Sequence, residues 1–257
     1  MAVSRTTYLI TGANRGIGRG LADLFLSRPN TALIALFRDP EDETSKSLAA
    51  SAFADNTAVI VLPYEAQNPD SAASALDTAQ KSHTWHGPTV DVTPEAINQH
   101  IAINTIAPLL SFRACLPLLQ VPSPSRSGPA KFIAISSEIG STTNQPKLSH
   151  ARSLPYGLSK AALNHTFRKL STEYPNMVVE MLTPGPVLTD LMRELRGMFD
   201  QVVKENPKLL ERFQPIDKVC KGLMECIDNA SLSFGENGSV TGTSGGFRDW
   251  KGDVIPW

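Results

Sequence analysis

The chain has 257 residues, 41% of them hydrophobic and 19% charged, with a formal net charge of −1 and a pI near 6.5. A chain of this length can bury one substantial core, so we expect a single domain over residues 1–257. The balanced charge gives no basic face for nucleic acid, and no apolar run reaches the ~20 residues that span a bilayer. These properties favour a small-molecule partner, and they are compatible with a homo-oligomer.

The N-terminal residues and the cysteines indicate the compartment. Residues 1–6 lead directly into a predicted strand and leave no room for the apolar core of a signal peptide, so we expect a cytoplasmic protein. Three cysteines suit neither a disulfide framework nor a pair of metal-binding knuckles, and we expect no metal site. Cys115, Cys220 and Cys226 are therefore expected to be buried free thiols.

Short apolar runs rich in strand formers alternate with helical patterns along the chain. Strands are predicted at residues 7–10, 31–37, 59–62, 131–136 and 177–182. The apolar spacing over residues 17–25 predicts a helix between the first two strands. Strands separated by helices indicate an α/β fold with a doubly wound parallel sheet that is covered on both faces.

A long helix is predicted to begin at Thr93-Pro94-Glu95, which reads as an N-cap, a first-turn proline and an early acid. Its apolar positions continue through Leu109, and Pro108 should kink the helix or end its first segment. Residues 121–129 are rich in proline and serine and predict a surface linker.

A glycine-rich turn joins the first strand to the first helix. Gly12, Gly16 and Gly18, with Ile17 between the last two, would let backbone amides approach a pyrophosphate at the helix N-terminus. The alternative is a tight connection without a ligand, because three glycines alone are a weak motif. The position between strand and helix favours the nucleotide.

The residue after the second strand indicates which nucleotide. A protein that binds NAD places an acid there to hold the ribose diol, whereas this chain has Arg38. Arg38 could pair with a 2′-phosphate, and Arg15 in the glycine turn could assist, so NADP(H) is the expected cofactor. The alternative is that Arg38 is merely the first solvated residue of a turn.

Tyr156 and Lys160 are four residues apart, so on a helix they share one face. Because an unperturbed tyrosine has a pKa near ~10, a neighbouring ammonium would favour its phenolate and ease proton exchange. Ser136 and Ser137 end the strand just upstream, where a hydroxyl could orient a substrate carbonyl. The spacing of Tyr156 and Lys160 also occurs by chance; the combination of residues favours catalysis.

The turn over residues 183–189 leaves the next strand, and its backbone, including Val187, together with Thr189 could hold a carboxamide. The alternative there is an ordinary proline-rich turn.

In combination and in this order, these pieces resemble the short-chain dehydrogenase/reductase family across nearly the whole chain. The matching elements are the glycine turn, Asn104, Ser137, Tyr156 with Lys160, and Pro184-Gly185. The closing residues 245–257 resemble those of fungal reductases of the norsolorinic acid ketoreductase type.

The resemblance implies a Rossmann-like fold and hydride transfer between NADP(H) and a carbonyl or alcohol. Tyr156 would donate the proton, and Lys160 would bind the nicotinamide ribose and lower the tyrosine pKa. Ser137 would hold the carbonyl oxygen, and Asn104 would keep a water in line with Lys160. Glu65 resembles the acid that follows the third strand in the family.

The chain departs from the family between Glu65 and Asn104, where the usual fourth strand, ending in Asn-Asn-Ala-Gly, has no counterpart. Residues 89–92 could supply a short substitute, although Pro88 and Pro94 restrict it. The chain could be a working enzyme with a repaired sheet, a variant with impaired cofactor binding, or a sequence that lost a segment in gene prediction or splicing. The abrupt join at residues 86–88 favours the last.

Two further regions bear on the substrate. Residues 144–153 lengthen the segment between Ser137 and Tyr156, and His150 within it reads as a solvated loop residue rather than a second acid. After Thr189, one helical face would carry apolar residues at Leu191, Leu195, Met198 and Phe199. This face could be a lid over an apolar, polyketide-type ketone, or an ordinary core-facing helix. A non-catalytic nucleotide-binding or scaffold protein is the rival class.

Overall fold

The computed structural model describes residues 5–39, 41–51, 53–64, 88–121, 128–148, 151, 153–187, 212–234 and 240–257. Its contacts divide the chain into two compact units. Unit 1 comprises Met1–Glu65 and Gly185–Met224, and unit 2 comprises Ala66–Pro184 and Glu225–Trp257. The expectation of one domain over residues 1–257 stays a prediction.

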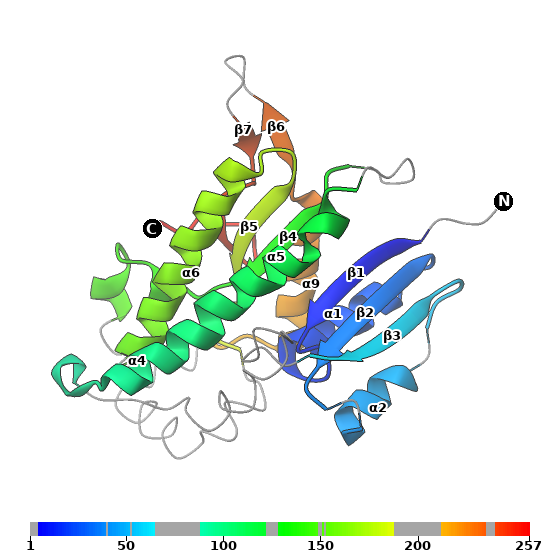
Figure 1. The fold of residues 1–257 in the computed structure, drawn as a ribbon, viewed down its shortest axis with the longest axis horizontal. Helices are drawn as coiled ribbons and strands as arrows, with labels where there is room; N and C mark the ends of the chain where they lie inside the picture. The colour runs from blue at the N-terminus through cyan, green and yellow to red at the C-terminus, as the bar shows by residue number, and fades with distance from the viewer. Residues whose placement is uncertain are drawn as a thin grey trace. The chain divides into compact units, whose positions relative to one another are not determined.

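Unit 1 is built on a parallel three-stranded sheet in the order β1-β2-β3 (Figure 1). Its elements are β1 (Thr6–Thr11), α1 (Gly16–Leu26), β2 (Thr31–Phe37), α2 (Glu43–Ala49) and β3 (Ala58–Pro63). One face of the sheet packs against α1 around buried Leu26, Leu33 and Phe37. Because strand side chains alternate, Leu9, Ile60 and Leu62 lie on the other face, and they are 39%, 52% and 45% exposed.

Unit 2 contains a second parallel sheet, in the order β4-β5-β8, and an antiparallel β6-β7 pair. Its strands are β4 (Lys131–Ile135), β5 (Val178–Thr183), β6 (Leu232–Phe234), β7 (Val240–Gly242) and β8 (Phe247–Asp249). Its helical elements are η1 (Thr89–Asp91), α4 (Pro94–Ile101), η2 (Ala102–Ile106), α5 (Ala107–Leu119), η3 (Glu138–Gly140), η4 (Gln145–Leu148) and α6 (Leu154–Glu173). The boundary between the units falls within α9 (Ile216–Asn229).

The core of unit 2 joins α5, α6 and the second sheet. Phe112 meets Phe132 and Phe167 edge-on, with ring centroids 5.1 and 6.3 Å apart. Met181 and Phe247 complete the same cluster from β5 and β8. This packing fixes α6 against the strand that precedes Ser137, which is the framework of the candidate site.

All five predicted strands are confirmed, each boundary lying within one residue of its expected position. The parallel pairing of every strand in the two larger sheets confirms the α/β class with parallel sheets flanked by helices. Helix α2 and the short strands β6 to β8 were not predicted, because their few residues carry no clear apolar period. Cys220 and Cys226 are buried free thiols as expected, whereas Cys115 is only partly buried.

The helix that begins at Pro94 continues to Leu119 as α4, η2 and α5, one rod in Figure 1. Thr93 caps it through a bond from the Ala96 amide, as expected. The distortion expected at Pro108 is a π-helical segment, η2, directly before it, where a wider turn accommodates the missing proline donor. By length and composition this rod could cross a membrane, unlike the sequence expectation that no apolar run is long enough.

The sheets also bear on the missing fourth strand. In the described segments 5–64 and 88–135, no strand pairs with the outer edge of β1 or of β4. Residues 89–91 form a turn of 3₁₀ helix rather than a strand, and Val90 is 89% exposed. The proposed repair of the sheet by residues 89–92 is therefore wrong, since Pro88 and Pro94 bracket a segment too short to pair.

Candidate active site

The glycine turn of unit 1 has the shape of an anion site. Gly12 and Gly16 have φ of +66° and +56°, a region that glycine enters without strain. A Cβ on Gly18 would lie 2.2 Å from the Gly12 carbonyl oxygen, so only glycine lets α1 begin this close to the turn. The N-terminus of α1 has no side-chain cap and no acid in its first turn. Its amides and dipole therefore fit a pyrophosphate.

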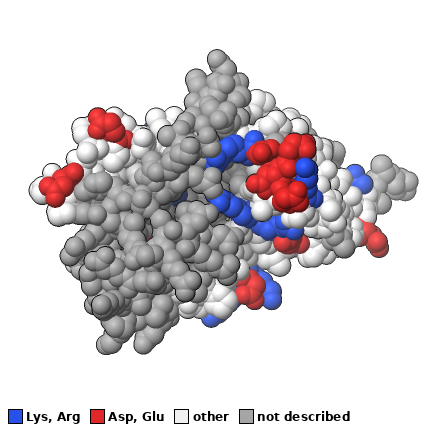
Figure 2. Space-filling view, turned by 90° about the horizontal axis from the view of Figure 1, so that it is seen from below, with Lys and Arg blue, Asp and Glu red and all other residues white. Residues whose placement is uncertain are grey.

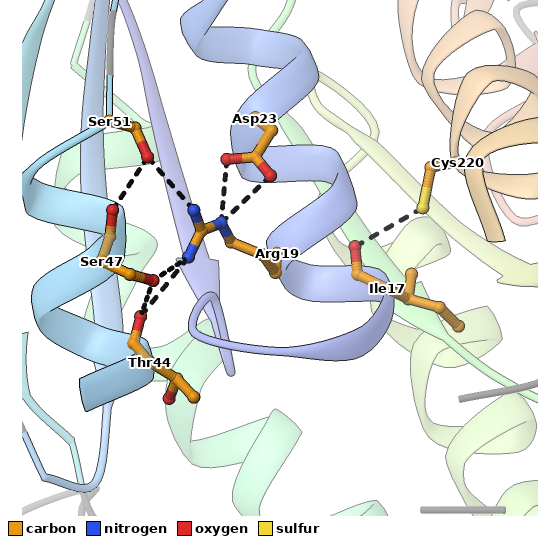
Figure 3. A network of polar contacts seen from close by, with 7 residues as sticks. All are labelled: Ile17, Arg19, Asp23, Thr44, Ser47, Ser51 and Cys220. Carbon is orange, nitrogen blue, oxygen red and sulfur yellow. Dashed lines mark hydrogen bonds and ion pairs between the residues drawn. The ribbon is translucent and has the colours of Figure 1, made fainter. Parts of the chain in front are cut away.

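Helix α1 is held on two sides (Figure 3). Arg19 pairs with Asp23 at 2.9 Å and donates to Ser47 Oγ at 2.7 Å and to Ser51 Oγ at 3.1 Å, which ties α1 to α2. On the other side, the Cys220 thiol lies 3.7 Å from the Ile17 carbonyl oxygen. These contacts hold the start of α1, which contains Ile17 and Arg19, against α2 and against Cys220 of α9.

The glycine turn and Arg38 follow the carboxyl ends of the paired strands β1 and β2, respectively. The Gly12 amide donates to the Leu36 carbonyl at 2.8 Å, and Arg38 is the first residue after β2. The hydrogen bond to the Thr44 hydroxyl lowers the pKa of the Asp42 carboxyl, and the charge of Arg15, in the glycine turn, adds a smaller effect in the same direction.

Acidic and basic side chains adjoin on the face seen in Figure 2. Around α2, Glu41 pairs with Lys46 at 3.3 Å, and Asp42 caps the helix at the Thr44 amide. Glu41 and Asp42, which follow Arg38 in the chain, therefore interact with residues of α2.

The catalytic candidates of unit 2 come together as the sequence predicts. Tyr156 and Lys160 lie on one face of α6, with Lys160 Nζ 5.7 Å from the centre of the Tyr156 ring. Ser137, just after β4, hydrogen-bonds to the Tyr156 side chain. The buried Lys160 donates to the Ile135 carbonyl at 2.8 Å.

The pKa of Tyr156 differs from the expectation. Burial raises it above its ordinary value, and the bond from Ser137 opposes this with a smaller effect. Burial also lowers the pKa of Lys160 to about 8. The Lys160 ammonium donates to a backbone carbonyl. A phenol with a pKa above its ordinary value stays protonated at neutral pH, which suits a proton donor.

Two glycines bring the Ser137 turn close to α6. A Cβ on Gly140 would lie 2.8 Å from the carbonyl carbon of Lys160, and one on Gly157 would lie 3.1 Å from the Ile139 side chain. Only small residues let the turn approach this closely, and that approach places Ser137 against Tyr156. These glycines were missed from the sequence because their close contacts are between segments far apart along the chain.

Asn104 is linked to the same helix through Ser159, which the sequence analysis also missed. Asn104 Nδ2 donates to Ser159 Oγ at 3.0 Å, and Thr105 Oγ1 donates to the Ser159 carbonyl at 2.8 Å. Ser159 Oγ in turn donates to the Tyr156 carbonyl at 2.7 Å. His100, also missed, packs its ring edge-on to Tyr156 at 6.1 Å between centroids.

The two serines after β4 have different surroundings. Ser136 is buried and donates to Asn164 Oδ1 at 2.6 Å, a structural bond inside unit 2. Ser137 is the one beside Tyr156. The loop that follows contains a 3₁₀ turn over Gln145–Leu148, and Leu148 is buried.

Several predicted residues lie outside the described part of the chain. These are Glu65, His150, Thr189, the face with Leu191, Leu195, Met198 and Phe199, and most of the join at residues 86–88. Val187 is described, in unit 1, where it forms a bridge with Gln214.

The fold and these motifs define a dehydrogenase or reductase of the Rossmann-like class, and the comparison with protein families agrees. The model of the short chain dehydrogenase family matches residues 6–199. The chain therefore belongs to the short-chain dehydrogenase/reductase family and is an oxidoreductase.

Its curated relatives include norsolorinic acid ketoreductases. The norsolorinic acid ketoreductase nor1 of Dothistroma septosporum is 32% identical over 242 residues, covering 88% of this chain and 87% of that protein. The ketoreductase stcE of Emericella nidulans is 27% identical over 269 positions, covering 98% of this chain and 94% of that protein. Because 269 exceeds the 257 residues of this chain, the alignment includes positions for which the chain has no residue.

Solved structures agree on the fold. The NADPH-bound carbonyl reductase from chicken fatty liver is 25% identical, with a TM-score of 0.73 and 99% coverage of both chains.

Proposed function

We propose that this chain is an NADP(H)-dependent carbonyl reductase in which Tyr156 donates the proton. The observation that carries the proposal is the assembly of Tyr156, Ser137, Lys160 and Asn104 within unit 2. A phenol that stays protonated at neutral pH beside a serine hydroxyl suits the reduction of a ketone or aldehyde. The same groups would serve alcohol oxidation in reverse.

Each residue has a stated part in this mechanism. Tyr156 transfers its phenolic proton to the substrate oxygen, while the Ser137 hydroxyl donates a hydrogen bond to that oxygen and stabilises its growing negative charge. Lys160 lies beside the Tyr156 ring, where its ammonium would stabilise the phenolate left behind and hold the nicotinamide ribose. When bound, the reduced nicotinamide supplies the hydride. Asn104 donates a hydrogen bond to Ser159 and so helps to hold the turn of α6 that carries Tyr156 and Lys160.

The uncapped glycine turn would hold the pyrophosphate, and Arg38 with Arg15 would select the 2′-phosphate. The NADPH-bound chicken liver reductase supports this choice. Replacing Arg38 with aspartate should shift the NADPH-to-NADH affinity ratio by about 10- to 100-fold toward NADH, because one charge-assisted pair is lost and a repulsion gained. Fluorescence titration measures the ratio. Arg113→Asp, an exposed residue of α5, makes the same charge change and should leave the ratio unaltered.

The substrate class follows from the relatives. Two matched proteins are named for reducing norsolorinic acid, so we propose an apolar, polyketide-type ketone as substrate. Tyr156→Phe should lower kcat by about 10²- to 10⁴-fold and leave NADPH binding measurable, because only the donated proton is removed. Steady-state reduction of aromatic and of small polar ketones tests both points. Retained turnover in the phenylalanine variant contradicts the role of Tyr156, and equal turnover of polar ketones contradicts the substrate class.

A second candidate is a nucleotide-binding protein of the same fold with impaired catalysis. The edges of β1 and β4, unpaired among the described strands, favour it. NADPH titration of the purified wild-type chain separates the two: saturable binding with ketone reduction supports the reductase, binding without turnover supports the second candidate, and no binding contradicts both.

A further inference from the structure

His100 lies in the catalytic cluster of unit 2 although the proposed mechanism gives it no part. It stands one helical turn before Asn104 in α4 and is only 6% exposed. Its ring meets Tyr156 edge-on, with an interplanar angle of 72°. Its Nδ1 is 3.5 Å from Asn104 Nδ2, at the long end of the hydrogen-bond range.

The surrounding bonds decide which hydrogens are available. The Ser159 hydroxyl donates to the Tyr156 carbonyl, so its oxygen must accept the bond from Asn104 Nδ2. The second hydrogen on Nδ2 then points to His100 Nδ1, which has to accept. An accepting Nδ1 requires a neutral imidazole with its proton on Nε2. This pattern fixes the orientation of the Asn104 amide, because Nδ2 makes both hydrogen bonds and Oδ1 makes neither.

The neutral form is also the one that the surroundings favour. Among the elements that the structure describes, those packed most extensively against α4 are α6 and η2. Segment η2 contains no ionisable side chain, and α6 brings Tyr156 and, beyond its ring, Lys160. Burial lowers the pKa of His100 below its ordinary value. A positive charge on the imidazole would also place an N–H donor against the Asn104 amide hydrogens.

We propose that neutral His100 is a positioning residue, which accepts a hydrogen bond from Asn104 and buttresses the Tyr156 ring so that both stay in the orientation used for proton transfer. Protonation of His100 would remove the acceptor and release Asn104, which would lower activity on the acid side. This inference rests on the proposed reductase function.

The first test does not depend on turnover. Long-range ¹H–¹⁵N correlation spectra of the imidazoles report which nitrogen of each histidine carries the proton. His100, assigned by the signal lost in His100→Asn, should be the Nε2–H tautomer at neutral pH, and its Nδ1 shift should move in Asn104→Leu. An Nδ1–H tautomer would overturn the proposal, as would an Nδ1 shift that ignores the Asn104 substitution in a variant with native circular dichroism.

The second test uses the kcat pH profile of ketone reduction. His100→Leu removes the acceptor and should lower kcat about tenfold, equivalent to one lost hydrogen bond, with NADPH affinity unchanged. His100→Asn offers an amide oxygen near the place of Nδ1 and should recover most of kcat. It should also lose the fall in kcat at low pH that protonation of His100 causes. The exposed His165→Asn serves as the control and should change neither value.

Equal kcat in the leucine and asparagine variants, or the same fall in kcat at low pH in His100→Asn, would show that His100 has no positioning role. Absence of turnover in the wild type would instead contradict the reductase function, and the imidazole spectra would still decide the inference.

Discussion

In unit 1 the groups that would meet a ligand are mainly backbone amides at an uncapped helix end, whereas in unit 2 they are side chains bonded to one another. The amides of α1 have no side-chain partner at the N-cap, so their arrangement depends on the glycine turn and on the sheet beneath it. Asn104 and Lys160 are held by Ser159 and by the Ile135 carbonyl, all within unit 2.

This difference separates chemistry from cofactor binding. The catalytic side chains stay assembled although no described strand pairs with the outer edge of β4, the edge opposite β5. In unit 1, by contrast, Leu9 of β1 and Ile60 of β3 stay largely exposed. We infer that an unpaired outer edge, as both β1 and β4 have among the described strands, weakens nucleotide binding more than it disturbs the proton-transfer group.

The largest expected effect comes from the ion pair inside unit 2. Glu180 of β5 is fully buried and hydrogen-bonded to Arg248 of β8. Glu180→Gln would leave the Arg248 charge without its counter-charge and should lower the free energy of unfolding by roughly 3–5 kcal/mol. Chemical denaturation measures the loss.

The exposed pair of Lys169 with Glu173 provides the control, because Glu173→Gln should cost less than about 1 kcal/mol. The double variant Glu180→Met with Arg248→Met removes both charges and should recover much of the loss. Equal losses in the two glutamine variants would show that the framework of unit 2 does not depend on this pair.

An intermediate effect is expected at the glycine turn of unit 1. Gly18→Ala puts a Cβ 2.2 Å from the Gly12 carbonyl oxygen, so the turn has to move. We expect a loss of about 1–3 kcal/mol in stability and of NADPH affinity, with the internal bonds of unit 2 retained. Isothermal titration and thermal unfolding measure the two losses.

Gly20→Ala on the same helix is the matched control. Its Cβ would meet the Cys220 side chain, with Sγ at 2.6 Å and Cβ at 3.4 Å, and the additional change Cys220→Ala removes the closer contact and leaves an ordinary one. NADPH affinity that survives Gly18→Ala would contradict the assignment of the turn to the pyrophosphate.

The smallest effect concerns the stability of unit 2 as pH rises. The pKa of Lys160 is about 8 in the folded protein and near its ordinary 10.5 when unfolded. Between these values the unfolded chain binds more protons, so stability should rise with pH, by at most about 1.4 kcal/mol per pH unit. Below pH 8 both states carry the proton, and the full cost of burying it remains.

Comparison of the wild type with Lys160→Met by urea denaturation at several pH values isolates this contribution. The methionine variant should lack the rise between pH 8 and 10.5, whatever the constant effect of losing the bond to the Ile135 carbonyl. If the free energy of unfolding changes with pH in the same way in both proteins, burial of the Lys160 ammonium does not lower the stability of the folded chain.

Much of the site followed from the sequence because its residues are local in the chain. Tyr156 and Lys160 are one helical turn apart, and Gly12 to Gly18 span a single strand-to-helix turn. The missed residues became visible only through packing. His100 and Ser159 belong to different helices, and nothing in a single sequence indicates that α4 and α6 bring them to the same amide.

The pKa of Tyr156 could not be predicted from the sequence, although Tyr156 and Lys160 are close together in the chain. Proximity on a helix face suggested a lowered tyrosine pKa, but burial of the phenol raises the pKa of Tyr156 instead. The sign of a pKa shift depends on desolvation, which is a property of three-dimensional surroundings.

The amino-acid sequence by itself determined the alternating strands and helices, the family and the identity of the candidate catalytic residues, because short-range periodicity and local motifs encode them. Tertiary structure decided which serine hydrogen-bonds to Tyr156 and at which positions a Cβ would clash, so that glycine is required. It also decided that residues 89–91 form a turn instead of a strand. Those outcomes depend on close packing between distant segments, and close packing is a property of the folded chain.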